Sequence, residues 1–177
     1  AQKLVRFVKL IRKLTLAGCV TAYHDRSDGG LAATLSEMMF ASHVGLDVTL
    51  DGLIDGAKDV EAATAALFNE EIGAVVQIPA DRLEDVKSQA AAAGLSDCLF
   101  VVARINTTDT FKVTCGENVL VDEKRTDLMR VWSEVSHEIA RGRDNPACAD
   151  SELEVACGTD HQGLFVKTTF DPEEHPS

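Results

Sequence analysis

The 177-residue sequence predicts a mixed α/β protein of the α+β class, in which a mixed sheet packs against helices. Helical and strand-like segments intermix along the chain, but the later strands follow one another through a hairpin turn, which disfavours a purely parallel sheet. Apolar residues make up 45% of the chain and charged residues 26%, as in ordinary globular domains. A chain of this length can bury a core that needs no metal or disulfide to stabilise it.

The first fifty residues predict two helices and two strands. Residues 3–18 place apolar side chains at helical spacing, and Gly18 suits the end of that helix. The apolar run 19–23 is typical of a buried strand and leads into a turn that contains two glycines. A helix over 31–43 and an alternating strand over 45–50 follow.

The next part of the chain predicts further strands between helices. Helices are expected over 58–68 and over 80–93, the latter opened by Pro79 and closed by Gly94. The expected strands are 73–78, 98–105, 110–115 and 119–121, with the sequence CGEN as the hairpin turn between the last two. A final helix, 124–141, carries Trp132 on an apolar face whose spacing predicts a core or a subdomain interface.

Charge divides the chain into a body and a tail. Residues 144–177 hold one basic and eight acidic side chains, which is more than half of the net charge of −12, together with three of the four prolines. We therefore expect a folded subdomain over 1–143 and an acidic linker over 144–177.

Composition also limits the partners and the compartment. The pI near 4.7 argues against a nucleic-acid or anionic-membrane surface. The longest apolar runs fall short of the ~20 residues of a membrane span. Five cysteines without CxxC spacing favour reduced thiols, and hence the cytoplasm. The start at Ala1, inside a helical pattern, suggests a piece of a longer polypeptide, although removal of an initiator Met would give the same start.

The motif with the clearest chemistry is HDRSDGG, between a strand and a helix. Gly29 and Gly30 permit positive φ and a close approach of the backbone to a ligand. The helix that follows presents free N–H groups, which suit a phosphate. Asp25 supplies a hard oxygen for Mg²⁺, and Ser27 supplies a hydroxyl donor. The motif therefore predicts a site for a magnesium nucleotide.

Two other interpretations remain open on the residues alone. Ser27 or Asp28 could merely cap the next helix, with the glycines forming a tight turn. Neither the GxxxxGK[ST] nor the GxGxxG fingerprint of nucleotide sites occurs. Asn69 and Glu70 could contact a substrate or a metal, or could simply form the polar end of a helix.

The stretches HDRSDGGL, LFNEEIGAVVQIP and RDNPACAD together resemble the large formylglycinamidine ribonucleotide synthases of purine biosynthesis. The first stretch is shared with the wider aminoimidazole ribonucleotide synthetase superfamily, and the third narrows the resemblance to the large synthases. The resemblance implies the C-terminal subdomain of the second synthetase half, in a polypeptide that continues into a glutaminase domain.

The resemblance also implies an activity and a set of roles. The family converts formylglycinamide ribonucleotide, ATP and glutamine into the amidine, ADP, phosphate and glutamate. Asp25 would be a Mg²⁺ ligand, Ser27 a contact to a structural ADP, and Gly29 and Gly30 the turn beside them. The chain has no glutaminase nucleophile motif and no catalytic residue of its own, so we expect the isolated segment to be inactive. The alternatives are another ATP-dependent member of the superfamily or a non-catalytic interaction subdomain.

Overall fold

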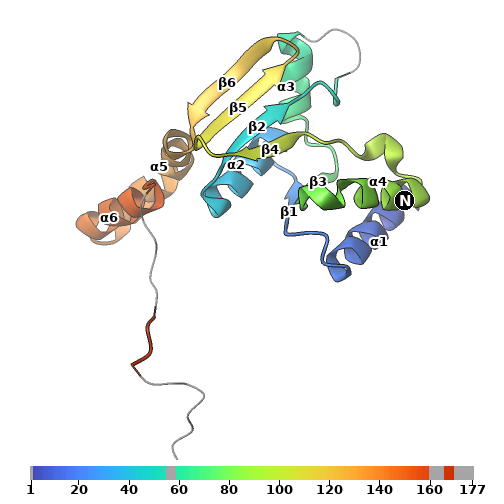
Figure 1. Ribbon diagram of the computed structural model, residues 1–177. Coiled ribbons are helices and arrows are strands. Elements are labelled where there is room, and N and C mark those ends of the chain that lie inside the picture. The colour runs from blue at the N-terminus through green and yellow to red at the C-terminus, as the bar shows by residue number, and fades with distance from the viewer. Residues whose placement is uncertain (1, 55–58, 160–165, 170–177) are drawn as a thin grey trace, which may run out of the picture. The chain divides into compact units, whose positions relative to one another are not determined.

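The computed structural model describes residues 2–54, 59–159 and 166–169. The chain forms two compact units, Ala1–Leu128 and Met129–Ser177. The helices, labelled in Figure 1, are α1 (Gln2–Leu16), α2 (Gly30–Ser42), α3 (Val60–Phe68), α4 (Leu83–Ala92), α5 (Arg125–Arg143) and α6 (Pro146–Ala156). The strands are β1 (Ala22–Arg26), β2 (Gly45–Thr49), β3 (Gly73–Gln77), β4 (Ala103–Asn106), β5 (Thr110–Cys115) and β6 (Asn118–Lys124). Short 3-10 turns, η1 (Ala80–Arg82) and η2 (Ser96–Cys98), flank α4.

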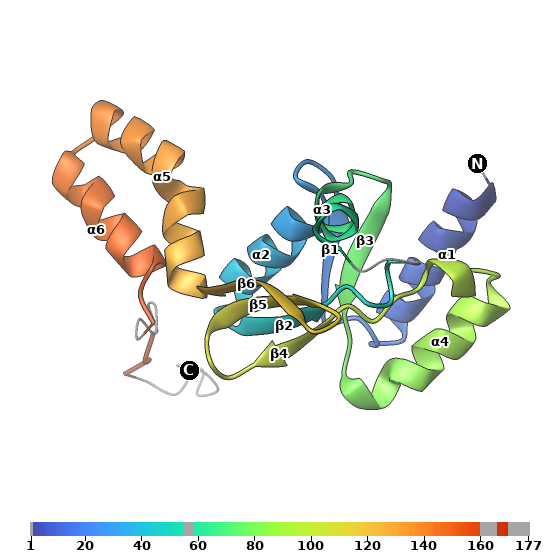
Figure 2. The ribbon, with the colours of Figure 1, turned by 90° about the horizontal axis from the view of Figure 1, so that it is seen from above.

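The larger sheet has four strands in the order β4-β2-β5-β6. Strands β2 and β5 are parallel, with Val48 opposite Val113, and the other pairs are antiparallel. This confirms the predicted mixed sheet and α+β class. Side chains alternate across β5, so that Phe111 and Val113 are buried while Lys112 lies on the other face. Helices α2 and α3 lie on one and the same face of this sheet (Figures 1 and 2).

A smaller antiparallel sheet joins β1 to β3 and carries the HDRSDGG motif. Asp25 lies opposite Ala74, and Arg26 lies opposite Gly73. Helix α2 follows β1 directly and contacts both β1 and α3. The end of β1 and the start of α2 are therefore fixed against the segment that joins α3 to β3.

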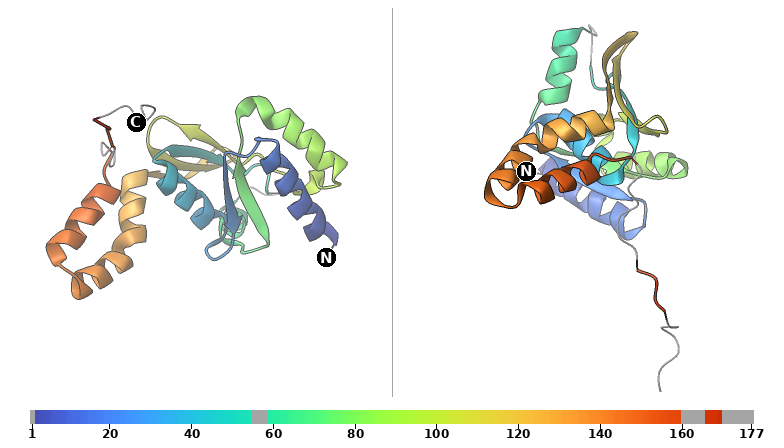
Figure 3. Two further views of the ribbon diagram at one scale, coloured as in Figure 1. Left: turned by 90° about the horizontal axis from the view of Figure 1, so that it is seen from below. Right: turned by 90° about the vertical axis from the view of Figure 1, so that its left-hand side faces the viewer.

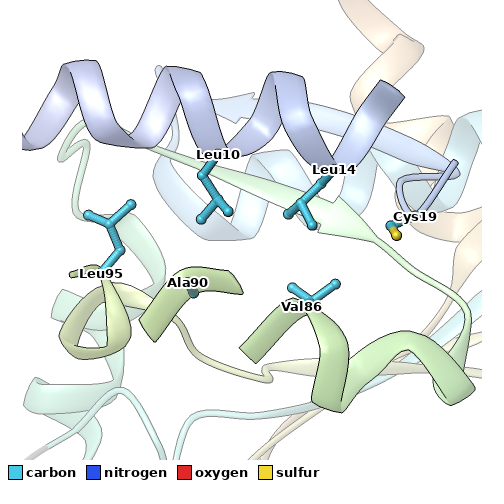
Figure 4. Close-up of a cluster of buried hydrophobic side chains, with 6 residues drawn as sticks. All are labelled: Leu10, Leu14, Cys19, Val86, Ala90 and Leu95. Atoms are coloured by element: carbon cyan, nitrogen blue, oxygen red, sulfur yellow. The ribbon is translucent and has the colours of Figure 1, made fainter. Parts of the chain in front are cut away.

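Helices α1 and α4 lie side by side (Figure 3) and share a separate apolar cluster (Figure 4). Its buried members are Leu10, Leu14, Cys19, Val86, Ala90 and Leu95. Leu14 is 1% exposed and Ala90 is completely buried. The apolar spacing that predicted α1 therefore corresponds to the face that packs on α4.

Two strands begin later than the sequence predicts. Gly18 has a φ of 67°, and the N–H of Cys19 donates to the carbonyl of Leu14, so the chain stays with α1 through Cys19. The strand expected over 19–23 is instead β1, which runs on to Arg26. Likewise, η2 occupies the start of the strand expected over 98–105, and β4 begins only at Ala103.

The second unit holds a helix that the sequence analysis did not predict. Residues 146–156, assigned to a linker, form α6, whose cap Asn145 accepts hydrogen bonds from the N–H groups of Ala147 and Cys148. Ion pairs join α6 to α5, including Arg141 to Asp150 at 2.8 Å. Trp132 was expected in a core or at a subdomain interface; its side chain is 57% exposed, so the core alternative is wrong and the interface stays a prediction. The rest of the expected linker, 160–165 and 170–177, lies outside the described residues.

No helix among the described residues combines the length and the apolar character that crossing a bilayer requires.

Candidate functional site

The HDRSDGG motif spans the end of β1, a turn and the start of α2. Asp25 lies within the strand, although the sequence placed it in the turn, and Ser27 follows the last strand residue. Gly29 is the N-cap of α2 and Gly30 is its first residue. The four residues predicted to bind Mg²⁺ and nucleotide therefore lie along one continuous strand-to-helix connection.

The two glycines adopt the backbone conformation that the sequence predicts. Gly29 has a φ of 78° and Gly30 a φ of 63°, both in the left-handed region. A Cβ atom on Gly30 would lie 2.7 Å from the carbonyl oxygen of Leu67 and 2.8 Å from the carbonyl carbon of Phe68. The close approach that Gly30 permits is thus an approach to the protein's own backbone, at the end of α3.

The segment after α3 is tied to the motif by its polar groups. The N–H of Gly29 donates to Oε1 of Glu70 at 3.0 Å. The N–H of Glu71 donates to Oδ1 of Asn69 at 2.8 Å, and Nε of Arg26 donates to the carbonyl oxygen of Glu71 at 2.8 Å. The structure therefore brings Asn69 and Glu70, the two additional candidates from the sequence, to the motif turn.

The strand side of the motif is held by α2. Nε2 of His24 lies 2.7 Å from Oε2 of Glu37 on α2, and Nδ1 lies 2.8 Å from the carbonyl oxygen of Asp25. These contacts give His24 a hydrogen-bonding, structural role. The hydroxyl of the buried Thr34 donates to the carbonyl oxygen of Gly30 at 2.9 Å. Both ends of the turn are therefore fixed.

Asp25, Ser27 and Asp28 present exposed side chains. Neither Ser27 nor Asp28 caps α2. Gly29 is the N-cap, and no side chain forms a capping hydrogen bond to the first turn of the helix. Within the described ranges, no residue forms a hydrogen bond or an ion pair with the carboxylate of Asp25. That carboxylate is therefore accessible to a ligand.

The residues fit Mg²⁺ as part of a site. Magnesium is commonly held by one or two carboxylates together with substrate phosphates and water, and Asp25 supplies one such carboxylate. Among the described residues there is no group of three or more His, Cys, Asp or Glu side chains that could hold a metal ion. The remaining ligands would have to come from a phosphate, from water or from another domain.

The comparison with protein families assigns the fold. A family model described as "AIR synthase related protein, C-terminal domain" matches residues 1–116. The chain belongs to this family.

Solved structures similar to this family member come from Thermotoga maritima. "PurL complexed with FGAR" matches 70% of this chain at 21% identity with a TM-score of 0.59, and "PurL complexed with ATP" matches 68% at 20% identity with a TM-score of 0.57. "Phosphoribosylformylglycinamidine synthase II" matches 68% at 21% identity with a TM-score of 0.57. At this identity the likeness establishes a shared fold. This chain spans only 20% of the length of each of those proteins.

The sequence of this AIR synthase-related domain did not reveal the long-range hydrogen bonds that hold the HDRSDGG motif in place. Glu70 is 41 residues from Gly29 in sequence, and the carbonyl of Glu71 is 45 residues from the Arg26 guanidinium. No local spacing indicates such contacts. The available signal was indirect: the predicted strand at 73–78 follows Asn69 and Glu70 closely, and its pairing with β1 brings them beside the motif.

Proposed function

We propose that this chain is the C-terminal subdomain of the second synthetase half of a large phosphoribosylformylglycinamidine synthase. The family match over residues 1–116 and the PurL structures of the same fold support the proposal. The parent enzyme would be an ATP-dependent carbon–nitrogen ligase of the cytoplasm that uses glutamine as the amide donor. Within it, 1–143 is the subdomain, and 144–177 leads to the glutaminase domain.

The segment contributes part of a nucleotide site, which we propose holds a structural ADP. One observation carries this proposal: the exposed carboxylate of Asp25, which forms no hydrogen bond or ion pair with a described residue, lies near the end of β1, two residues before the exposed Ser27. When bound there, Mg²⁺ would neutralise phosphate charge against Asp25. Ser27 would donate to the nucleotide, and Gly29 and Gly30 would shape the turn.

This chain holds only part of the nucleotide site, and the catalytic residues of the synthase would lie in other domains. With one accessible carboxylate, the segment would bind Mg-ADP only weakly by itself, and the companion synthetase subdomain would supply the other contacts. No catalytic residue is assigned to the segment. We therefore expect no synthase activity from the isolated chain.

A non-catalytic interaction subdomain is the second candidate, and the surface of α1 favours it. Leu4, Val5 and Val8 are 48%, 51% and 56% exposed, on a helix rich in basic residues. Exposed apolar groups of this kind are typical of surfaces that contact other domains or proteins. Such contacts are compatible with a place inside a larger synthase, but they do not require a nucleotide.

One experiment tests the first candidate against the second. The complete polypeptide that contains this segment is assayed for glutamine- and ATP-dependent amidination of formylglycinamide ribonucleotide, with the 177-residue chain as control. We expect activity from the complete polypeptide and none from the chain alone. A complete polypeptide that lacks both a second synthetase half and the activity would contradict the proposal and favour the interaction subdomain.

A further inference from the structure

One face of strand β1 is open, and it carries an aromatic side chain beside Asp25. Nε2 of His24 lies 2.7 Å from Oε2 of Glu37, so the His24 side chain points toward α2. Successive side chains of a strand point to opposite faces, so those of Tyr23 and Asp25 point away from α2. Both side chains are exposed, Tyr23 to 48%. An aromatic ring and an accessible carboxylate therefore share this face.

The paired strand β3 adds apolar side chains to the same face. Val76 lies opposite Tyr23, and Ala74 lies opposite Asp25. Directly opposite residues of an antiparallel pair have neighbouring side chains on one face, and both of these are half-buried. Along the strand, Tyr23 and Asp25 are separated by two residues, or roughly 7 Å. The face thus offers a carboxylate and, next to it, an apolar and aromatic surface.

We propose that Tyr23 stacks on the base of the nucleotide whose Mg²⁺ Asp25 binds, an inference that rests on the proposed function. A nucleotide presents both matching groups: phosphates that a magnesium ion can join to a carboxylate, and an aromatic base held at the far side of a ribose. Every nucleotide base has a π-face on which an aromatic side chain can stack. Tyr23 therefore makes the site favour a nucleotide over an inorganic phosphate.

The ring of Tyr23 can be observed directly, because it is the one tyrosine of the chain. The 177-residue chain is labelled with fluorotyrosine, so that fluorine NMR gives a single tyrosine signal. Mg-ADP and Mg-pyrophosphate are added separately, up to the millimolar range. We expect Mg-ADP to shift the signal strongly through the ring current of the base, and Mg-pyrophosphate, which has no base, to shift it little. Equal shifts with the two ligands would overturn the proposal.

Variants of Tyr23 test the contribution of stacking to affinity, measured from the backbone amide shifts of Asp25 and Ser27. Tyr23→Ala should weaken the binding of Mg-ADP by about fivefold or more and leave that of Mg-pyrophosphate within twofold. Tyr23→Phe keeps the ring and should bind both ligands as wild type does. An unchanged affinity of Tyr23→Ala for Mg-ADP, or an equal loss for both ligands, would contradict stacking on the base.

Phe100→Ala is the matched control. Phe100 is an aromatic residue with a similar exposure of 45%, and it lies between η2 and β4. Its removal should leave both affinities within twofold of wild type. Thermal unfolding of each variant shows that it is folded.

The two ligands also separate this proposal from the proposed function. If Asp25→Ala weakens the binding of both ligands but Tyr23→Ala changes neither, the magnesium nucleotide site stands and the stacking is wrong. If wild type binds neither ligand, the stacking is wrong for this chain. Retention of ADP by the complete polypeptide, compared with its Asp25→Ala variant, then decides the proposed function independently.

Discussion

Gly30 is the residue at which backbone conformation and packing both require glycine. Gly18 has a similar positive φ of 67°, but a Cβ there would meet no atom within 4 Å. A Cβ on Gly30 would lie 2.7 Å from the carbonyl oxygen of Leu67. Substitution of Gly18 therefore tests conformational strain alone, whereas substitution of Gly30 tests strain together with steric overlap.

Gly18→Ala should cost about 1 kcal/mol of unfolding free energy, from the left-handed conformation alone. Gly30→Ala should cost about 3 kcal/mol, because α2 must also move away from the end of α3. Urea unfolding followed by circular dichroism measures both values. Equal losses in the two variants would show that the approach of α2 to α3 is not tight.

The buried Arg125 allows a second prediction for single residues, on the free energy of unfolding. Its side chain is 2% exposed and forms a two-point contact with Asp109, at 2.6 Å and 3.1 Å. Asp109 has a φ of 55°, which asparagine tolerates well, so Asp109→Asn changes the charge without backbone strain. Because the variant leaves a buried cation without its counter-charge, we expect a loss of about 3 kcal/mol.

Adding Arg125→Met to Asp109→Asn should recover part of this loss, since the buried charge is then removed as well. Urea unfolding of the two single variants and the double variant gives the coupling energy. Strictly additive losses would contradict a direct pairing of the two side chains.

At the scale of elements, a surface ion pair links α1 to η2. Nζ of Lys3 lies 3.0 Å from Oδ2 of Asp97, and the hydrogen bond from Lys3, followed by that from the Cys98 thiol, lowers the pKa of Asp97. A carboxyl group with a lowered pKa in the folded state stabilises the fold above its unfolded-state pKa. This stabilisation is lost as the pH falls through the folded-state pKa.

Asp97→Asn should therefore lower the melting temperature slightly at neutral pH, and this difference from wild type should vanish in acid. Both side chains are exposed, so the effect is small and decreases with added salt. Lys3→Met should show the same pH dependence. A difference in melting temperature that persists unchanged below the folded-state pKa of Asp97 would show that the Lys3–Asp97 ion pair is not its cause.

Elements with local sequence signals were predicted with mixed success. Strand β5 has the predicted bounds, 110–115, because its alternation matches one buried and one polar face of the sheet. Helix α6 was missed although Asn145 and Pro146 are a typical cap and first-turn pair, because the acidic composition suggested a linker. The start of β1 was misplaced because Cys19 contributes to the cluster with α4 rather than to a strand.

At the scale of the whole molecule, the candidate site depends on contacts that no local pattern encodes. The sequence predicted Asp25, Ser27, Gly29 and Gly30 as a group, and they do form one connection. The junction with Asn69 and Glu70 arises only when β3 pairs with β1. Likewise, the apolar face of α5 predicted a core or a subdomain interface, and Val131, Val135 and Ile139 are 61–70% exposed, so this face is not part of a core in the described structure and the interface stays a prediction.

Nucleotide retention by the complete polypeptide is a direct test of the proposed role of Asp25 in binding Mg²⁺ and ADP. The complete polypeptide is purified as wild type, Asp25→Ala and Asp28→Ala, and the bound ADP and Mg²⁺ are quantified per protein. Asp28 is the matched control, since it is an exposed carboxylate of the same turn with no assigned ligand. We predict that Asp25→Ala loses most of the bound ADP and Mg²⁺ while Asp28→Ala retains them. Unchanged ADP and Mg²⁺ in Asp25→Ala would show that Asp25 does not hold the magnesium nucleotide.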